Sequence, residues 1–248
     1  MTTTQIRPKK LPKPRKRSTV EHGTTLNSAF KQIRDLIVYG RLSPGAWIVE
    51  AELTEKLKMS RTPVRGALQW LQREGYVIEQ RSRSKSRMIV APLTREDASE
   101  LYSIVGHLEG LAGRLTVALP KEQRAALVAK IRAINARLHR IARTRELGGE
   151  SIFDLDTEFH RLIVEASAGP RLMLMHNGIK PQTERYWRLY TSNIIDRLDV
   201  TVAEHEAIIS AIHKADPDAA EAALIQNWVK GSQRLAQVIE AHGDRGSW

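Results

Sequence analysis

The sequence predicts a mainly α-helical protein with two unlike parts: three short helices and a two-stranded hairpin, followed by an antiparallel bundle of six or seven helices. Three observations support this prediction. From residue 95 to about 241, apolar residues recur only at helical spacing, with breaks at Pro120, Gly148-Gly149, Gly169-Pro170 and Asp216-Pro217. Between residues 26 and 91, three short helical segments precede two extended runs. The third observation is a change in charge between the two parts.

The charge is concentrated in the first third of the chain. Residues 1–92 contain 19 Lys and Arg against 7 Asp and Glu, a net of +12, whereas the remaining residues contain 20 against 21, a net of −1. The first third is therefore suited to a polyanionic partner, and the remainder to a neutral partner or none.

The composition excludes several classes of protein. The 248 residues include no cysteine, which excludes disulfides and thiolate metal sites and fits a reducing cytoplasm. No run of about 18 apolar residues occurs, so no membrane span is expected. The N-terminus lacks the apolar stretch of a secretory signal. Residues 1–24, rich in Lys, Arg and Pro, are expected to form a disordered arm that either lies along DNA or only solubilises the chain.

The stretch from Met59 to Gly75 has the features of a short helix with one apolar and one cationic side. Ser60 is a suitable N-cap, Pro63 falls in the first turn, and Gly75 is a C-terminal stop. An apolar stripe with i, i+3, i+4 and i+7 spacing predicts the buried side: Val64, Ala67, Leu68 and Leu71. Arg61, Arg65 and Gln69 lie on another side, as in helices that enter a DNA major groove. An ordinary amphipathic helix with solvated arginines is the alternative.

The neighbouring segments favour DNA binding. Helices are predicted at 26–39 and about 50–58, and the tight turn before Ser60 makes a helix-turn-helix with the helix at 61–74. Strands are predicted at 76–79 and 87–90. Four basic residues in and beside the hairpin loop make it a wing able to reach the DNA backbone or minor groove: Arg81, Arg83, Lys85 and Arg87.

Residues 26–91 resemble the winged helix of GntR-family bacterial transcription regulators. The resemblance lies in Gly40-Arg-Leu-Ser-Pro-Gly45, Ser60-Arg-Thr-Pro-Val-Arg65 and Glu74-Gly75. It implies that Arg61 and Arg65 contact bases and phosphates, and that the hydroxyls of Ser60 and Thr62 contact phosphates.

The chain departs from the family pattern at three places in this region. Gly66 stands where Glu is usual, and Ala51 where some members have a DNA-contacting Arg. The wing is about three residues longer, with Arg87 in place of the usual tip glycine. These departures affect the path of the wing and the choice of operator.

A domain boundary is predicted at Ala91-Pro-Leu-Thr94, where Thr94 caps the next helix and Asp97 takes the third helical position. The predicted organisation is an arm at 1–24, a DNA-binding domain at 25–92, a helical effector-binding and dimerisation domain at 93–242, and a tail at 243–248. The predicted helices of the bundle are 95–118, 121–146, 151–168, 170–191, 196–214 and 217–241.

Four polar residues are predicted to face the interior of the bundle. Asp156 and His160, at i and i+4, border the stripe of one helix, whereas His205 and Asn227 fall within the apolar rows of two others. Unpaired burial would cost roughly 1–3 kcal/mol for each group. Either a divalent metal ion binds them together, or each is hydrogen-bonded separately to the backbone.

The pattern Asp156-x-x-Phe159-His160, followed by Glu204-His205, Asp216 and Ala220, resembles the FCD effector domain, over about residues 94–240. The resemblance implies that Asp156, His160 and His205 are ligands of a divalent ion (Zn, Ni or Mn) that helps to anchor a small carboxylate. Asn227 stands where a fourth ligand, His, is usual, and Val105 stands where an effector-binding Arg is often found.

A group of large residues near the end of the helix at 170–191 is a second candidate for effector binding. Tyr186, Trp187, Arg188 and Tyr190 combine aromatic surface with one cation, which suits an aromatic or acidic ligand. Packing in the core or at an interface is the alternative.

These features together predict a homodimeric DNA-binding transcription regulator, a repressor, that responds to a small organic acid and binds a double-stranded operator. No enzymatic activity is expected. Two rival hypotheses come from other classes: a metal-dependent hydrolase using Asp156, His160 and His205, which lacks a motif for a general base, and a sequence-independent nucleoid protein, which would not need a neutral bundle.

Overall fold

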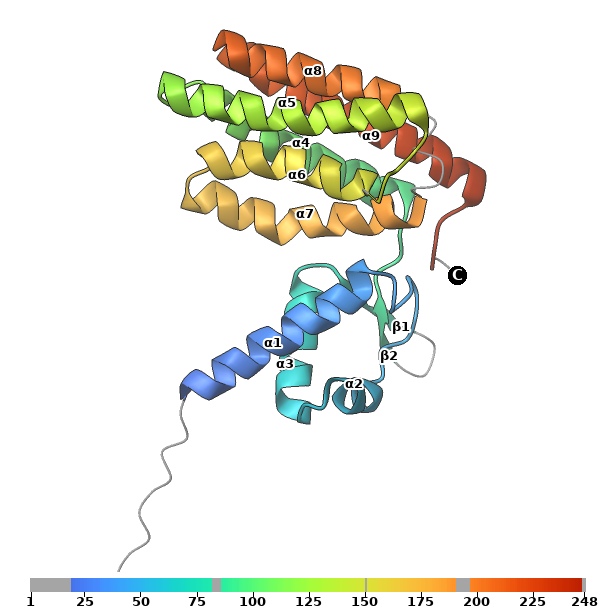
Figure 1. The fold of residues 1–248 in the computed structure, drawn as a ribbon. Coiled ribbons are helices and arrows are strands. Elements are labelled where there is room, and N and C mark those ends of the chain that lie inside the picture. Colours follow the sequence, from blue (N-terminus) through green and yellow to red (C-terminus); the bar gives the residue numbers. More distant parts are fainter. Residues whose placement is uncertain (1–18, 82–85, 150, 191–196, 247–248) are drawn as a thin grey trace, which may run out of the picture.

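The structure, a computed structural model, describes residues 19–81, 86–149, 151–190 and 197–246, excluding the side chains of 19–24, 189, 190 and 242. A helical bundle stands over a smaller N-terminal part, and an extended linker around residues 91–94 joins them (Figure 1). Among the described helices, none is long and apolar enough to cross a lipid bilayer.

The N-terminal part is a winged helix. It contains α1 (Thr19–Val38), α2 (Glu50–Leu57), α3 (Arg61–Arg73), β1 (Val77–Arg81) and β2 (Ser86–Val90). The predicted stripe of α3 is buried against α1, which confirms the predicted inner side of this helix. Ser60 is its N-cap, but the Ser60 side chain makes no capping hydrogen bond. Gly75 has a φ of +79°, the left-handed conformation expected of a residue that ends a helix.

Helix α1 begins earlier than the sequence predicted. Its first residue is Thr19, so the last residues assigned to the basic arm are helical. The rest of that arm, residues 1–18, lies outside the described residues.

The wing is an antiparallel pair in which Val77 lies opposite Val90 and Arg81 opposite Ser86. The segment before α2 runs beside β2, with Trp47 bridged to Ile89. Arg83 and Lys85, both predicted to contact DNA, fall in the loop 82–85 and lie outside the described residues.

The second part contains the six helices that the sequence predicted, each within about two residues of its predicted bounds. They are α4 (Arg95–Thr116), α5 (Lys121–Thr144), α6 (Ile152–Ser167), α7 (Pro170–Tyr190), α8 (Leu198–Lys214) and α9 (Pro217–His242). The Thr94 hydroxyl accepts a hydrogen bond from the backbone N–H of Asp97, which confirms the predicted cap.

Helices α4 and α9 pack with little space between them. A Cβ at Gly106 would lie 2.8 Å from Trp228, and one at Gly113 would lie 2.2 Å from Leu224. The glycines of α4 therefore allow α9 to approach closely, which brings Asn227 and Trp228 near the interior of the bundle.

Helix α7 is the bundle helix nearest the winged helix, and α5 and α8 lie on the far side (Figure 1). Gln182 donates to the carbonyl of Glu74 at 2.7 Å, just after the recognition helix α3. Arg185 donates to the carbonyl of Ala91 in the linker at 2.5 Å. The chain also returns to this junction at its other end, where Leu93 and Arg245 exchange two backbone hydrogen bonds.

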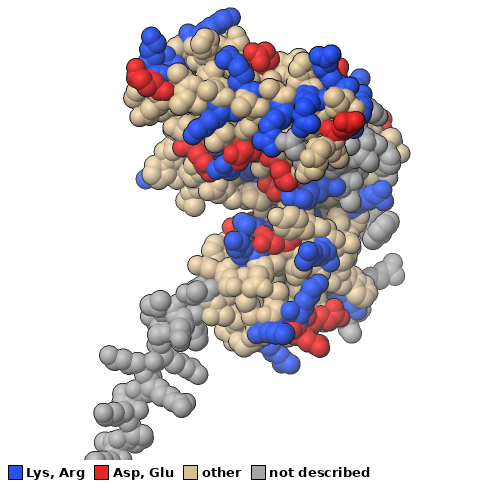
Figure 2. Space-filling model, in the orientation of Figure 1, with Lys and Arg blue, Asp and Glu red and all other residues tan. Residues whose placement is uncertain are grey.

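On the face shown in Figure 2, acidic and basic side chains alternate over the bundle, as the near-zero charge of residues 93–248 predicts. On the winged helix, several Lys and Arg side chains gather at the end furthest from the bundle, beside a small acidic group. The two parts of the molecule therefore differ in surface charge as well as in fold.

Candidate functional sites

The first site is the exposed side of α3. Arg61, Thr62, Arg65 and Gln69 are all exposed on this helix, and the apolar stripe holds the opposite side against the core. Arg65 is paired with Glu50 at the start of α2, with Nη2 2.9 Å from Oε2. The structure thus brings the predicted contact residues of α3 together on one surface.

The wing carries two further predicted contact residues. Arg81 and Arg87 are exposed on β1 and β2, respectively. The guanidinium of Arg87 lies 3.8 Å from the centre of the Trp47 ring. No sequence pattern marked Trp47 as a contact residue.

The structure gives a packing reason for one departure from the family motif. A Cβ at Gly66 would come within 2.9 Å of a methyl group of Leu26 on α1. Gly66 therefore lets α1 lie close to α3, whereas a larger residue would displace the Leu26 side chain. Ala51 is exposed in the first turn of α2 and has no such constraint.

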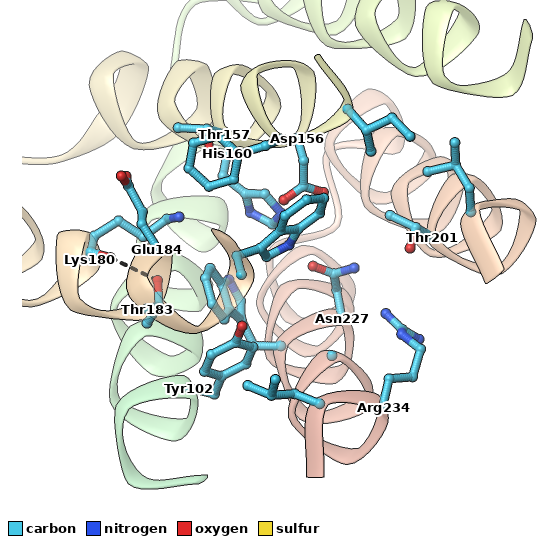
Figure 3. Close-up of a pocket in the computed structure, with 17 residues that line it drawn as sticks. Tyr102, Asp156, Thr157, His160, Lys180, Thr183, Glu184, Thr201, Asn227 and Arg234 are labelled. Atoms are coloured by element: carbon cyan, nitrogen blue, oxygen red, sulfur yellow. Dashed lines mark hydrogen bonds between the residues drawn. The ribbon is translucent and has the colours of Figure 1, made fainter. Parts of the chain in front are cut away.

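The second site is a small pocket in the bundle, with a cavity volume of about 60 Å³ (Figure 3). Helices α4, α6, α7, α8 and α9 all contribute to its wall. Its polar lining residues include Tyr102, Asp156, Thr157, His160, Lys180, Thr183, Glu184, Thr201, Asn227 and Arg234, and its aromatic ones are Phe153, Trp187 and Trp228.

Two of the predicted metal ligands, Asp156 and His160, line this pocket, and His205 lies close to both without lining it. Asp156 and His160 are one turn apart on α6, and His205 faces them from α8. One potential ligand atom from each of the three lies within 4.8 Å of the others. The i, i+4 spacing read from the sequence therefore does bring these groups together.

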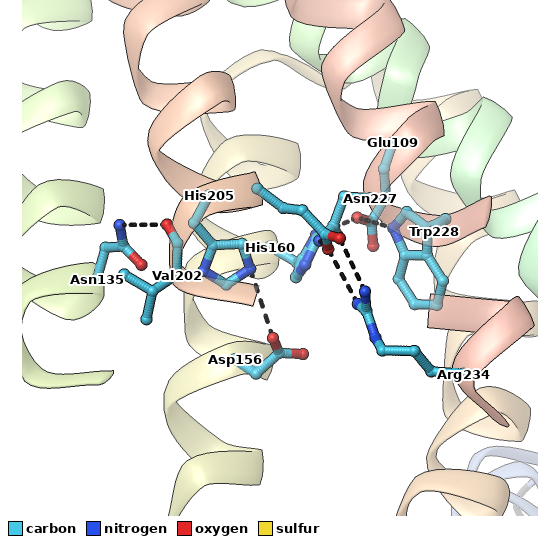
Figure 4. A network of polar contacts seen from close by, with 10 residues as sticks. Glu109, Asn135, Asp156, His160, Val202, His205, Asn227, Trp228 and Arg234 are labelled. Carbon is cyan, nitrogen blue, oxygen red and sulfur yellow. Dashed lines mark hydrogen bonds and ion pairs between the residues drawn. The ribbon is translucent and has the colours of Figure 1, made fainter. Parts of the chain in front are cut away.

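His205 is fully buried and its ring stacks on Phe159, with centroids 3.8 Å apart and an interplanar angle of 4°. Within the described part of the chain, neither ring nitrogen has a hydrogen-bond partner, although Nε2 is 3.5 Å from Asp156 Oδ1 (Figure 4). Burial lowers the pKa of His205 well below its ordinary value, and the nearby His160 adds to this effect. A neutral imidazole with unsatisfied nitrogens can accept a cation.

His160 is oriented by a buried carboxylate. Its Nδ1 donates to Glu109 Oε2 at 2.6 Å, so its other nitrogen is left for a ligand on the pocket side. Burial alone would lower the pKa of His160, but the Glu109 carboxylate raises it. The pKa of His160 is therefore raised overall. A carboxylate behind a histidine is the usual support of a metal-binding imidazole.

Glu109 is itself fully buried and accepts two more hydrogen bonds, from His176 at 2.9 Å and from the indole of Trp228 at 2.7 Å. Burial would raise the pKa of Glu109, but the charge and hydrogen bond of His160, the hydrogen bond from His176 and the charge of Lys180 lower it far below its ordinary value. Glu109 therefore stays ionised and ties α4 to α6, α7 and α9.

Asn227 is held by Glu204. Its Nδ2 donates to Glu204 Oε2 at 3.0 Å, and Arg234 donates to the same carboxylate at 2.8 and 2.9 Å (Figure 4). Because the carboxylate only accepts hydrogen bonds, the amide nitrogen must face it. In Figure 3 the amide oxygen of Asn227 lies on the side of Asp156.

The residues of this site fit a divalent cation. Asp156, His160 and His205 offer two imidazole nitrogens and one carboxylate oxygen, and the unsatisfied nitrogens of His205 are a reason for a cation to bind there. Asn227, where the family pattern has a fourth imidazole, lines the same pocket and offers an amide oxygen.

The predicted effector residues have different surroundings. Trp187 lines the pocket. Tyr186 does not: it is fully buried at the junction, where its hydroxyl donates to Asp97 at 2.5 Å and accepts from the backbone of Thr94. Arg188 lies over the rings of Tyr39 and Phe153, at 4.4 and 4.1 Å. The side chain of Tyr190 lies outside the described residues.

Comparisons with known proteins agree with this architecture. The model of the bacterial regulatory proteins of the gntR family matches residues 25–85, and that of the FCD domain matches residues 100–228. A probable D-xylose utilization operon transcriptional repressor from Paenarthrobacter nicotinovorans is 31% identical, over 81% of this chain and 85% of its own length. The transcriptional repressor NanR from Cronobacter sakazakii is 27% identical, over 71% of each chain.

Solved structures show the same fold. McbR/YncC from E. coli superposes with a TM-score of 0.64 at 20% identity, covering 86% of this chain and 97% of that one. A GntR regulator from Rhodococcus sp. RHA1 gives a TM-score of 0.60 at 21% identity, covering 88% and 99%.

The relatives are transcription regulators rather than enzymes, so the hydrolase hypothesis is wrong. The family matches confirm the resemblance inferred from the sequence, including the DNA-binding function. The chain belongs to the GntR family of bacterial transcription regulators and joins its winged helix to an FCD domain.

Proposed function

We propose that this regulator is a homodimeric repressor whose affinity for its operator is set by a small organic acid and a divalent metal ion bound in the FCD pocket. The observation that carries the proposal is the position of α7. One side of this helix lines the pocket, and the other side contacts the winged helix.

The pocket side of α7 contributes Lys180, Thr183, Glu184 and Trp187. Lys180 and, from α9, Arg234 are the cations of the pocket lining, and aromatic rings form part of the wall. A carboxylate placed between a metal ion and these cations would have its charge compensated, and its carbon skeleton would contact the rings.

The other side of α7 contacts three parts of the DNA-binding domain. Gln182 reaches the end of α3, Arg185 the linker, and Arg188 the ring of Tyr39 just after α1. At its N-terminal half, His176 is bonded to Glu109, which in turn holds the candidate ligand His160. A shift of α7 on ligand binding would therefore change the placement of α3, which is how an effector could alter operator affinity.

An exposed apolar strip on α4 supports dimerisation. Ile104, Leu111 and Leu115 are all more than a third exposed and lie at spacings of seven and four, on one side of the helix. A twofold contact through this strip would place two winged helices for the half-sites of a pseudo-palindromic operator.

The test of the proposed function begins with selection of duplexes from a random library by the full-length protein. We expect one preferred sequence with two related half-sites, and we expect Arg65→Ala to weaken binding to it by about 1–3 kcal/mol. Titration with Zn²⁺, Ni²⁺ or Mn²⁺, against a chelator control, should change the affinity for the selected duplex. Equal affinity for selected and scrambled DNA would instead support the nucleoid-protein hypothesis.

A further inference from the structure

The extended segment before α2 places a large aromatic side chain on the surface beside the wing. Trp47 is 62% exposed. Its backbone is bridged to Ile89, and the N–H of the next residue, Ile48, donates to the carbonyl of Met88 at 2.9 Å. These backbone contacts fix the position of the indole next to β2.

Arg87 of β2 lies over this indole, with its guanidinium carbon 3.8 Å from the ring centre. Stacking restricts the arginine while leaving its N–H groups able to donate in the plane of the guanidinium. Among the ion pairs of the described residues, none involves Arg87. The wing therefore presents a cation whose side chain is positioned and which no acidic group of the described residues pairs with.

A short stretch of chain connects the stacked pair to a residue that contacts the recognition helix. Glu50 follows Trp47 by three residues and accepts hydrogen bonds from Arg65 of α3. The three-residue step from Trp47 to Glu50 therefore links the Trp47–Arg87 stack beside the wing to the Glu50–Arg65 pair on α3.

We infer that Trp47 is a DNA-binding residue of this protein: its indole packs on the apolar deoxyribose edge of the duplex and positions Arg87 to contact a phosphate. The inference rests on the proposed DNA contacts of α3 and the wing. It is supported by continuity with that surface and by the composition of the pair, because an exposed aromatic ring combined with an unneutralised cation is typical of surfaces that bind nucleic acid.

The experiment measures the affinity of the full-length protein for a fluorescein-labelled duplex that the wild-type protein selected from a random library, and for a scrambled duplex of the same composition. Trp47→Ala should weaken binding to both by about fivefold, because the contact is to the backbone. It should also lower the slope of log affinity against log salt by about one, because Arg87 loses its position. Trp47→Phe keeps a ring and should retain most of the affinity.

Two controls separate this contact from general effects of mutation. Arg73→Ala removes another exposed arginine, from the last turn of α3, and should leave the salt slope closer to that of the wild type. In the Arg87→Ala background, Trp47→Ala should cause a smaller additional loss than it does alone, because the two residues act together.

Unchanged affinity of Trp47→Ala, or a loss of affinity with an unchanged salt slope, would overturn the inference. Failure of the wild-type protein to select any duplex would instead overturn the proposed function, and the inference with it.

Discussion

Arg65 of the recognition helix and Glu50 at the start of α2 form an ion pair with three short contacts. The Nε of Arg65 is 3.2 and 3.3 Å from the two carboxylate oxygens, and Nη2 is 2.9 Å from Oε2. The hydrogen bond from Arg65 to Glu50 raises the pKa of Arg65. Exposed pairs contribute little to stability, so the main consequence concerns the proposed DNA contact: a base or phosphate that binds Arg65 would compete with Glu50 for this arginine.

The first prediction concerns this competition. Glu50→Gln should increase affinity for scrambled duplex DNA by about tenfold and make the salt slope steeper by about one, because the released guanidinium can neutralise a phosphate. Fluorescence anisotropy over a range of salt concentrations measures both quantities. Glu52→Gln, which removes an exposed acid from the same turn of α2, is the matched control. Equal effects of the two variants would show that only net charge matters.

The second prediction concerns the metal ion. Titration of the chelator-treated protein should show binding of one divalent ion per chain, and His205→Ala should abolish it, because this variant removes a nitrogen that has no hydrogen-bond partner among the described residues. Metal at about one hundred times its dissociation constant should add about 2.7 kcal/mol to the free energy of unfolding.

Two further variants sharpen this metal test. Asn227→His should tighten Zn²⁺ binding, because an imidazole replaces the amide. His213→Ala, on the exposed last turn of α8, should bind as the wild type does. Unchanged metal binding in His205→Ala would contradict the site.

The third prediction concerns Glu109. Glu109→Gln should lower the free energy of unfolding by about 3–5 kcal/mol, because the buried carboxylate that pairs with His160 and accepts from two other donors is lost. Urea denaturation measures the change. Glu100→Gln, on the exposed side of the same helix, should be nearly neutral. A loss below about 1 kcal/mol would mean that the cluster contributes little to stability.

The fourth prediction concerns communication between the pocket and α3. In Gln182→Ala, the ratio of DNA affinities with and without bound metal should move toward one, because the side-chain bond from α7 to the carbonyl of Glu74 is removed. Metal affinity itself should not change. Gln123→Ala, on the exposed side of α5, should keep the wild-type ratio. If Gln182→Ala also keeps it, α7 does not couple the two sites through this bond.

The fifth prediction concerns the dimer. Leu111→Glu should shift the protein toward the monomer in sedimentation experiments, because a charge would be placed within the apolar strip on α4. Leu147→Glu, at another exposed leucine between α5 and α6, should leave the assembly unchanged. A dimer that persists in Leu111→Glu would place the interface elsewhere.

Most helix bounds could be predicted because their ends carry local signals. Thr94, Pro217 and Gly75 act within one turn of the helix that they begin or end. The start of α1 was missed because residues 19–25 lack apolar periodicity in the sequence.

The candidate metal ligands could be found for a similar reason. Asp156 and His160 are one turn apart, so their proximity follows from helix geometry alone. Glu109 was missed because its partners lie 51, 67 and 119 residues away, and a buried acid looks like an exposed one when only its own helix is considered. The sequence contained one indication that Glu109 is buried: its position on the apolar side of the helix predicted at 95–118. Arg234 was missed for the same reason, and Glu204 was noted only as part of the FCD pattern, because the two partners lie on different helices.

The two backbone hydrogen bonds between Leu93 and Arg245 hold the two ends of the effector domain together beside the linker. A chimeric regulator that receives this effector domain should therefore receive every residue from Leu93 up to and including Arg245. A transplanted domain that stops at the end of α9 would lack Arg245. The backbone N–H and carbonyl of Leu93 would then have no partner at the junction with the new DNA-binding domain.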